Sequence, residues 1–353
     1  MINKINTFGS SLLNGKFTKL LAFSLALIFS FNVGAQDAAE VPAVSGEVAY
    51  ILNTFLFLVC GFLVMFMAAG FCMLEAGQVR SKNTAVICLK NIGLFSIAGF
   101  MYYLVGYNLM YDGVDGGYIG SFSMFDRSSE VDLETGYAAA SDWYFQMVFV
   151  ATTASIVSGA LAERILIWPF FLFTAILTAF IYPIAGSWQW GGGWLSEMGF
   201  SDFAGSTLVH SVGGYAALAG AILLGARDGK YSADGKVNVI GGCSLPMTTL
   251  GVFILWLGWF GFNGGSQLAL GSGADATAVA DIFVNTNLAA AGGVLACMIV
   301  SKATNSHTNI AATLNGAIAG LVAITAEPLT PSMGQAVIIG AIGGIICMYG
   351  MKL

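Results

Sequence analysis

Charged residues are scarce in this chain. Asp, Glu, Lys and Arg together make up 9% of its 353 residues, whereas 57% of them are hydrophobic. So little polar surface excludes a soluble globular domain, and it leaves no basic surface on which nucleic acid could bind. The composition is that of a polytopic membrane protein, in which the charge of each loop is more informative than the net charge.

Histidine, proline and paired cysteines are also scarce. The chain has two histidines, and its six cysteines lie singly in or beside apolar segments with no CxxC pattern. Zinc frameworks and disulfide frameworks are therefore excluded, and we expect no metal, no cofactor and cysteines that serve packing. The 46 glycines against six prolines are typical of membrane helices that cross closely.

The first 35 residues have the pattern of a signal peptide. A lysine-containing segment precedes the apolar run LLAFSLALIFSFNV, and the small residues Val33-Gly34-Ala35 follow it. Cleavage after Ala35 would leave the mature N-terminus outside the cytoplasm, and the alternative is an uncleaved first anchor. We therefore predict a signal peptide over residues 1–35 and a single membrane domain over residues 36–353.

Nine apolar segments follow, each close to the ~20 residues that an α-helix needs to cross the hydrocarbon. If the mature N-terminus lies outside, most lysines and arginines, Lys90 among them, fall at the cytoplasmic ends of the helices and most acids fall at the outer ends. This distribution obeys the positive-inside rule and therefore supports an outside N-terminus. The long loop from Asp112 to Asp142 then lies on the outer face. The segments cover residues 48–74, 84–110, 142–162, 166–188, 204–226, 243–263, 278–300, 309–326 and 333–351.

The segment DFAGSTLVHSVGGYAALAGAILLGA, from Asp202 to Ala226, organises the rest of the chain. It places His210 within an apolar span, where an imidazole needs a polar neighbour or a function. Its small residues, such as Gly213 and Ala217, allow close approach of other helices. We predict an inner helix with a polar lining.

Aromatic side chains gather near three other segment ends. Phe145 and Phe149 lie four residues apart on one helix face, and Trp190 lies in the glycine-rich turn SWQWGGGWLSEMG. Phe262 and Ser266 are also four apart, although the two glycines between them are expected to break the helix. Two interpretations remain open: an aromatic belt at the membrane interface, or ring faces that attract a cation.

Several motifs together resemble those of the ammonium transporter family that includes the Amt, Mep and Rh proteins. The resemblance runs from about residue 48 to the end of the chain and keeps the order of the family's motifs. It implies an all-α bundle of two inverted halves of five helices closed by an eleventh, assembled as a homotrimer with one pore in each subunit. The segments that carry it are GFCMLEAGQVRSKN, SGALAERI, WGGGWL, DFAGSTLVH, GWFGFNGGS, FVNTNLAAAGG and NGAIAGLVAITA.

The resemblance also implies an outer recognition site. Phe145, Trp190 and Ser266 would bind the ammonium ion, and Asp202 would stabilise this site without touching the ion. Asp202 would also cap the helix that follows it. Ser206 replaces a glycine of the family's DFAGG pattern, and we expect its hydroxyl near this site.

Below the recognition site, Phe149 and Phe262 would stack as the pore gate and His210 would line the pore. A cation at the bilayer centre costs at least ~2.5–3.5 kcal/mol, and we expect no acid in the pore below Asp202 to offset that cost. The substrate should therefore lose its proton near the gate and pass as ammonia, with His210 offering a ring nitrogen. His307 is expected in a solvated cytoplasmic loop.

The predicted function is transport of ammonium or ammonia across the cell membrane, which we expect to be a bacterial inner membrane. The alternative is a sensor that binds ammonium and signals through a further C-terminal region. The family's second histidine and its last two helices would follow residue 353, so we expect the domain to be incomplete at its C-terminus. An enzyme is not expected. The predicted partners are membrane lipid, the other copies of a homotrimer and a PII-type regulatory protein.

Overall fold

A computed structural model describes residues 44–305 and 307–351, and regular structure in this part of the chain is helical apart from one isolated β-bridge between Tyr231 and Val237. The predicted signal peptide lies outside the described residues. The helices are α3 (Gly46–Gln78), the short η1 (Ser81–Asn83), α4 (Thr84–Met101) continued by η2 (Tyr102–Gly106) and α5 (Tyr107–Tyr111), α6 (Ala139–Ala160), α7 (Ile167–Ile176) continued by η3 (Leu177–Ile181) and α8 (Tyr182–Ser187), the short α9 (Trp194–Glu197), η4 (Ser206–Ser211) continued by α10 (Val212–Leu224), α11 (Leu245–Gly265), α12 (Gly273–Asn305), α13 (Ile310–Ile324) and α14 (Met333–Gly350).

The nine predicted spans coincide with nine helical runs, although their ends differ by several residues. Seven of the runs in the described chain are both long and apolar enough to cross a membrane; α6 and α13 are the other two. α13 has 15 residues. α6 carries polar residues along most of its length, but these side chains are buried among neighbouring helices. A helix surrounded by protein does not need an apolar surface, because its polar groups meet protein groups in place of lipid.

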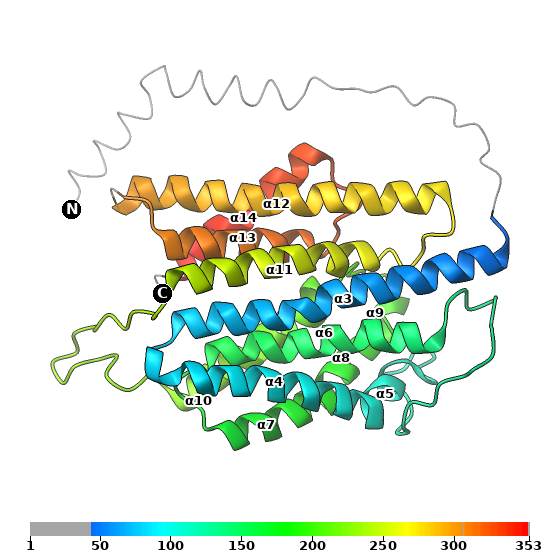
Figure 1. Ribbon diagram of the computed structural model, residues 1–353, viewed down its shortest axis with the longest axis horizontal. Helices are drawn as coiled ribbons and strands as arrows, with labels where there is room; N and C mark the ends of the chain where they lie inside the picture. Colours follow the sequence, from blue (N-terminus) through cyan, green and yellow to red (C-terminus); the bar gives the residue numbers. More distant parts are fainter. Residues whose placement is uncertain (1–43, 306, 352–353) are drawn as a thin grey trace, which may run out of the picture. The chain divides into compact units, whose positions relative to one another are not determined.

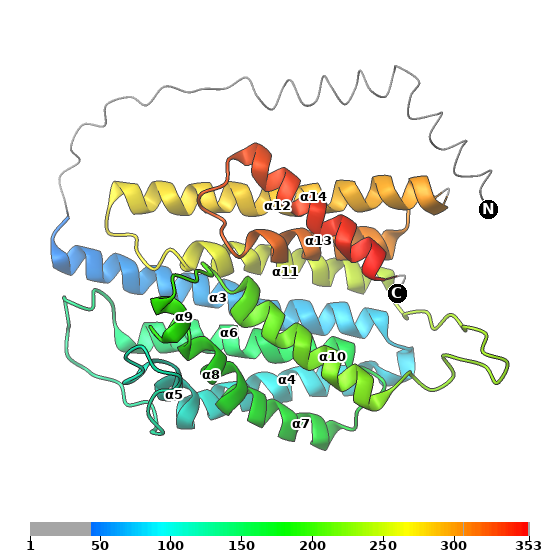
Figure 2. The ribbon, with the colours of Figure 1, turned by 180° about the vertical axis from the view of Figure 1, so that it is seen from behind.

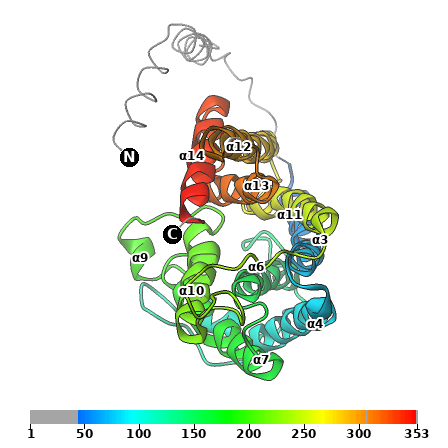
Figure 3. The ribbon, with the colours of Figure 1, turned by 90° about the vertical axis from the view of Figure 1, so that its left-hand side faces the viewer.

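The helices lie in two groups that meet along α3 and α11. α12, α13 and α14 pack on one another, and α11 joins them to α3, while α6 lies among α3, α4 and α10 (Figure 3). The loop after α10 and the loop after α5 lie at opposite ends of the helices (Figures 1 and 2). These two loops therefore emerge on opposite sides of a membrane that the helices cross.

Glycine allows α3 and α11 to approach closely enough for their backbones to touch. A Cβ added at Gly251 would lie 2.4 Å from the backbone nitrogen of Leu74 and 2.7 Å from the carbonyl oxygen of Gly70. Real Cβ atoms do not approach that closely, so only glycine fits at this crossing. All six cysteines lie in the described residues and are free there; Cys60 and Cys297 are buried, whereas Cys88 and Cys243 are exposed.

The prediction that α10 is an inner helix is wrong for one of its faces. Gly213 and Ala217 are buried, and Gly213 lies against α6. The opposite face carries large apolar side chains, and those of Tyr215 and Leu223 are 72% and 85% exposed. With 3.6 residues per turn, small residues four apart define only one stripe of a helix, so they bury one face and leave the other free.

Candidate functional site

One hollow in the described chain collects most of the predicted site residues, and we call it the aromatic hollow. Its volume is about 440 Å³. Phe145, Trp190, Ser266 and Asp202, predicted as the recognition site, all line it, and so does Phe149. The complete lining is Tyr107, Tyr111, Tyr137, Asp142, Phe145, Gln146, Phe149, Gln189, Trp190, Ser201, Asp202, Phe203, Ser266 and Leu268.

Trp190 is held in a fixed orientation at the wall of the aromatic hollow. Its indole Nε1 donates a hydrogen bond of 2.8 Å to the backbone oxygen of Asp202. Its ring meets that of Phe149 edge to face, with 6.0 Å between the centroids. A large aromatic ring whose polar edge is bonded elsewhere can present its face to a cation.

Ser266 lies at the end of α11, and the expected break at the glycines before it does not occur. The helix continues through Gly264 and Gly265, and the Ser266 hydroxyl donates to the carbonyl oxygen of Phe262 at 2.8 Å. A Cβ on Gly265 would lie 2.6 Å from the ring of Phe145. The glycines therefore make room for aromatic rings beside a regular helix.

Asp202 organises the backbone at the start of η4. One carboxylate oxygen accepts hydrogen bonds from the backbone N–H groups of Gly205 and Ser206, and the other accepts from those of Thr207 and Leu208, at 2.8–3.1 Å. Gly205 has a φ of +100°, and a Cβ there would lie 2.9 Å from the ring of Trp190. The carboxylate thus satisfies four helix N–H groups while its backbone oxygen holds Trp190.

Two phenylalanine rings lie at one side of the aromatic hollow, where Phe149 is part of the lining and Phe262 lies behind Phe149. The rings of Phe149 and Phe262 are stacked, with centroids 4.0 Å apart and planes inclined by 29°. Both side chains are almost completely buried. Phe262 in turn contacts the ring of His210, at 5.4 Å between centroids. Phe145 meets Phe149 edge to face at 4.8 Å, so the rings of this pair are not stacked on each other.

On the far side of this ring pair lies a second hollow, which we call the His210 hollow. Its volume is about 420 Å³, and it extends from His210 and Trp259 to arginine side chains beyond the end of α6. Its lining is Phe71, Leu74, Glu75, Gln78, Val79, Ser155, Ile156, Gly159, Ala160, Ala162, Arg164, His210, Arg227, Leu255, Trp259, Asn315, Ile318 and Val322. Phe149 lines the first hollow and His210 the second, and the ring of Phe262 contacts both of these side chains.

His210 leaves one ring nitrogen without a partner in the His210 hollow. Its Nδ1 lies 3.0 Å from the backbone oxygen of Gly205, whereas its buried Nε2 has no hydrogen-bond partner among the described residues. A carbonyl oxygen only accepts, so Nδ1 carries the proton and neutral Nε2 is an acceptor. The imidazole also lies nearly parallel to the indole of Trp259, at 5.1 Å.

The expectation that no acid lines the pore below Asp202 is wrong, because Glu75 lines the His210 hollow. Lys90, which was assigned to a helix end, is buried within α4, 3.2 Å from the Glu75 carboxylate. The Ser158 hydroxyl also donates to that carboxylate at 2.8 Å, and Lys90 donates to the Ser158 carbonyl oxygen at 2.6 Å. The acid is therefore neutralised by a lysine of the next helix and brings no net charge to the hollow.

Ser206 does not contribute a hydroxyl to the aromatic hollow, contrary to expectation. Its Oγ donates a hydrogen bond of 2.9 Å to the backbone oxygen of Val322 in α13. The side chain thus joins η4 to the second group of helices. His307, in contrast, is exposed beyond the end of α12, as predicted for a solvated loop.

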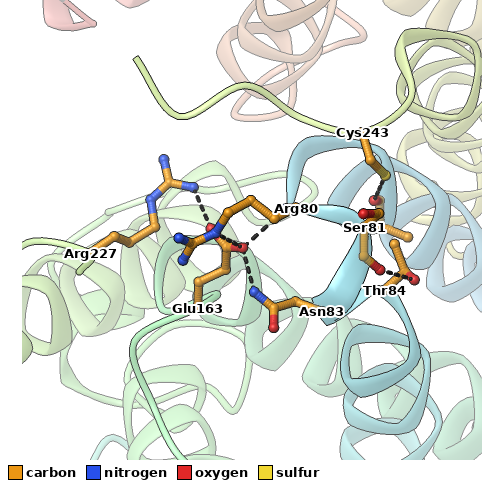
Figure 4. Close-up of polar contacts among 8 residues, drawn as sticks. Arg80, Ser81, Asn83, Thr84, Glu163, Arg227 and Cys243 are labelled. Atoms are coloured by element: carbon orange, nitrogen blue, oxygen red, sulfur yellow. Dashed lines mark hydrogen bonds and ion pairs between the residues drawn. The ribbon is translucent and has the colours of Figure 1, made fainter. Parts of the chain in front are cut away.

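A cluster around Glu163 joins three loops at the mouth of the His210 hollow (Figure 4). Its carboxylate accepts from the backbone N–H and Nε of Arg80 at 3.0 and 2.9 Å, from Asn83 Nδ2 at 2.5 Å and from Arg227 Nη1 at 3.1 Å. Burial raises the pKa of Glu163, but these hydrogen bonds outweigh burial and lower its pKa to about 2. The loops after α3, α6 and α10 are therefore held by one ionised carboxylate.

The sequence prediction missed Asp142 and the two polar side chains that are hydrogen-bonded to it in the aromatic hollow. Asp142 accepts hydrogen bonds from the Tyr107 hydroxyl and from Gln146, and all three line the hollow. Asp142 precedes Phe145 by three residues and Phe149 by seven, so it shares their face of α6. That spacing in the sequence could have indicated the position of Asp142.

A protein-family model described as the Ammonium Transporter Family matches residues 55–353. A putative ammonium transporter of Synechocystis sp. is 43% identical over 331 residues, covering 93% of this chain and 74% of that protein. Ammonium transporter Amt2 of Archaeoglobus fulgidus is 45% identical over 327 residues, covering 90% of this chain and 67% of that protein.

Solved structures share the arrangement of helices. A protein named Sensor Amt Protein has a TM-score of 0.81 at 38% identity, with 87% of this chain and 76% of that chain covered. Mep2 of Candida albicans has a TM-score of 0.77 at 31% identity, with 87% and 67% covered.

Proposed function

The chain belongs to the Ammonium Transporter Family, and we propose the route by which it carries out the family's function, the transport of ammonium and ammonia. It is a multi-pass membrane protein with seven sufficiently long, apolar helices in its described part. The route passes from the aromatic hollow, between the rings of Phe149 and Phe262, into the His210 hollow. The observation that carries this proposal is the stacked ring pair that lies between two hollows.

The ammonium ion is recognised in the aromatic hollow. The ring faces of Phe145 and Trp190 attract its charge, and Ser266 offers a hydroxyl oxygen. Asp202 acts through Trp190 and through the backbone of η4, because both of its carboxylate oxygens are already occupied by N–H groups. It is therefore a positioning residue for this site.

Ammonia continues through the ring pair after the ammonium ion has given its proton to solvent water on the outer side of the rings. The ring faces of Phe149 and Phe262 are stacked on each other and are not free to receive an ion, so a cation passing between them would bear most of the cost of desolvation. Beyond the rings, the free Nε2 of His210 accepts a hydrogen bond from an ammonia N–H. The opposite charges of Glu75 and Lys90 cancel, so this pair adds no net charge to the His210 hollow through which the neutral ammonia passes.

Replacement of Trp190 by Leu tests the recognition step. We expect ammonium binding to weaken by about 0.5–2 kcal/mol, the range of one cation–π contact, with discrimination lost before stability. The measurement is uptake of labelled methylammonium, with competition by ammonium, in a host that lacks its own transporter. Trp168→Leu is the matched control, since the Trp168 side chain is 76% exposed and lies outside both hollows.

Unchanged competition by ammonium in Trp190→Leu would remove the cation–π contact from the proposal. If Trp168→Leu weakened ammonium competition as much as Trp190→Leu, the effect would come from a general loss of assembly. The aromatic hollow would then not be supported as the recognition site. The two variants therefore separate recognition from folding.

A sensor function is the second candidate, because one structurally similar protein is named Sensor Amt Protein. That name applies to the other protein, and the two functions differ in a measurable way. A transporter moves labelled methylammonium into a vesicle, whereas a sensor binds ammonium without net uptake. Reconstitution of the chain in sealed vesicles distinguishes them.

We further propose the assembly and location of the chain. The exposed apolar side chains of the helices, such as Phe55, Phe62 and Ile92 at 59–65% exposure, support burial against lipid or other copies of the chain in a homotrimer. The first 35 residues act as a signal peptide, the mature N-terminus lies outside a bacterial inner membrane, and a PII-type protein regulates transport from the cytoplasm. Crosslinking in membranes tests the trimer, and N-terminal sequencing tests cleavage after Ala35.

A further inference from the structure

Buried carboxylates in the described chain differ in how their charge is balanced. Glu75 is paired with Lys90, and Glu163 is paired with Arg80 and Arg227. Asp202 has no cation beside it, but four backbone N–H groups point at its two oxygens. A buried negative charge without such compensation is strongly disfavoured.

Asp142 lacks compensation of this kind. It is 7% exposed, and among residues 44–305 and 307–351 it makes no ion pair. One oxygen accepts from the Tyr107 hydroxyl at 2.5 Å and the other from Gln146 Nε2 at 3.3 Å, and both donors are neutral. Its place in the first turn of α6 adds the partial positive charge of a helix N-terminus, which stabilises an acid by typically 0.3–1 kcal/mol.

Asp142 also has acceptor capacity left, whereas Asp202 does not. An ionised carboxylate offers about four lone-pair sites. Asp202 uses all four for the backbone, and Asp142 uses two for Tyr107 and Gln146. Both acids line the aromatic hollow, so a cation that enters it meets free carboxylate lone pairs only on Asp142.

We propose that Asp142 supplies the negative charge that binds the ammonium ion in the aromatic hollow. Tyr107 and Gln146 hold the carboxylate in place, and its remaining lone pairs accept N–H groups of the ion. The rings of Phe145 and Trp190 then provide preference for ammonium over metal cations, while Asp142 provides affinity for positive charge. The inference rests on the proposed function, because it adds a binding residue to the same recognition site.

The test is ammonium binding to the full chain in lipid nanodiscs, measured as the rise in melting temperature with ammonium chloride against potassium chloride at equal ionic strength. A ligand that binds only the folded state raises stability according to its concentration relative to Kd. We expect Asp142→Asn to need roughly 10- to 100-fold more ammonium for the same rise, the range for a hydrogen bond to a charged group. The melting temperature without ammonium should change little, because an asparagine oxygen still accepts from Tyr107.

Asp126→Asn is the matched control, because it removes the same charge from an exposed loop position outside the hollow. It should bind ammonium as the wild type does. Tyr107→Phe is a second variant that keeps the carboxylate but removes one of the two groups that hold it, so it should weaken ammonium binding less than Asp142→Asn does. A wild-type response in Asp142→Asn, or a greater loss in Tyr107→Phe than in Asp142→Asn, would overturn the inference.

The proposed function fails on a different result. If the wild-type chain shows no preference for ammonium over potassium, the recognition site itself is wrong. The other case is a wild-type chain that prefers ammonium and loses this preference in Trp190→Leu. If Asp142→Asn then keeps wild-type affinity, only the proposed role of Asp142 is wrong.

Discussion

His210 is the residue whose chemical state the surrounding structure defines most directly. The backbone oxygen of Gly205 accepts from Nδ1, and Nε2 faces the His210 hollow without a partner. A protonated imidazole would need a second acceptor at Nε2, and none is present among the described residues. The neutral form with the proton on Nδ1 is therefore the one that this site holds.

Nitrogen-15 NMR of the labelled chain tests this assignment. We expect His210 to show the pattern of the Nδ1–H tautomer at neutral pH, because Nδ1 lies 3.0 Å from the Gly205 carbonyl oxygen, which can only accept a hydrogen bond. His307 is the other histidine of the chain and is exposed, so it provides the solvated reference in the same spectrum. A proton on Nε2 of His210 would contradict the proposed acceptor role.

Asp202 is expected to stabilise the fold through both of its carboxylate oxygens. Each oxygen accepts two backbone N–H groups, so an asparagine would place its own amide N–H₂ against two of these donors. We expect Asp202→Asn to lower the free energy of unfolding by roughly 1–3 kcal/mol, and Asp202→Ala to lower it by at least as much. Chemical or thermal unfolding of the purified variants provides the measurement.

The control for Asp202 is Asp126→Asn, which changes an exposed acid and should leave stability unaltered. If Asp202→Asn were as stable as the wild type, the charge and the second oxygen would be dispensable, and capping by a single acceptor would be sufficient. Weaker ammonium binding without loss of stability would also be inconsistent with the four hydrogen bonds.

At the scale of helices, α3 and α11 depend on glycine at their crossing. A Cβ at Gly251 would lie within 2.4–2.8 Å of backbone atoms of α3, and backbone cannot rotate away as a side chain can. We expect Gly251→Ala to destabilise the fold by roughly 1–3 kcal/mol, the cost of overpacking a close contact. The melting temperature in detergent or nanodiscs reports this loss.

Gly214→Ala is the matched control for that prediction. Gly214 is also in a helix, and a Cβ there would meet nothing within 4 Å in the described chain. The same substitution should therefore stabilise α10 by up to roughly 1 kcal/mol through helix propensity. Equal effects of the two substitutions would show that propensity, not close packing, governs α11.

At the scale of the whole molecule, Glu163 holds three loops at one end of the helices. We expect Glu163→Gln to lower the free energy of unfolding by roughly 1–3 kcal/mol, because a neutral amide replaces an acceptor of charged hydrogen bonds. Glu130→Gln, in the exposed loop at the other end, should have no such effect. If both substitutions had the same effect, the cluster in Figure 4 would contribute nothing specific.

The pH dependence of this cluster follows from its pKa. The folded pKa of Glu163, about 2, is below the ordinary value of 4.5. A lowered pKa stabilises the fold fully above the ordinary value and loses that stabilisation as the pH falls toward the folded pKa. The difference in melting temperature between wild type and Glu163→Gln should therefore stay constant from pH 7 to about 4.5 and narrow below it.

Local patterns in the chain were sufficient to predict the helices, whereas the candidate site residues came from the resemblance to family motifs. Each apolar run near 20 residues has one favourable arrangement in a membrane, the helix, so the nine runs could be placed from sequence. The motifs around Phe145, Trp190, Asp202, His210 and Ser266 were also sufficient to single these residues out. The structure places Phe145, Trp190, Asp202 and Ser266 around the aromatic hollow and His210 at the second hollow, and this arrangement required the tertiary structure.

The tertiary structure alone decided how the buried charges are balanced. Glu75 meets Lys90, and Glu163 meets Arg80 and Arg227, across contacts between different helices and loops that no local spacing predicts. The acceptors of Asp202 are filled by its own helix, whereas those of Asp142 stay partly free. Electrostatic balance depends on distances of a few ångströms between segments far apart in sequence, and those distances exist only once the helices have packed.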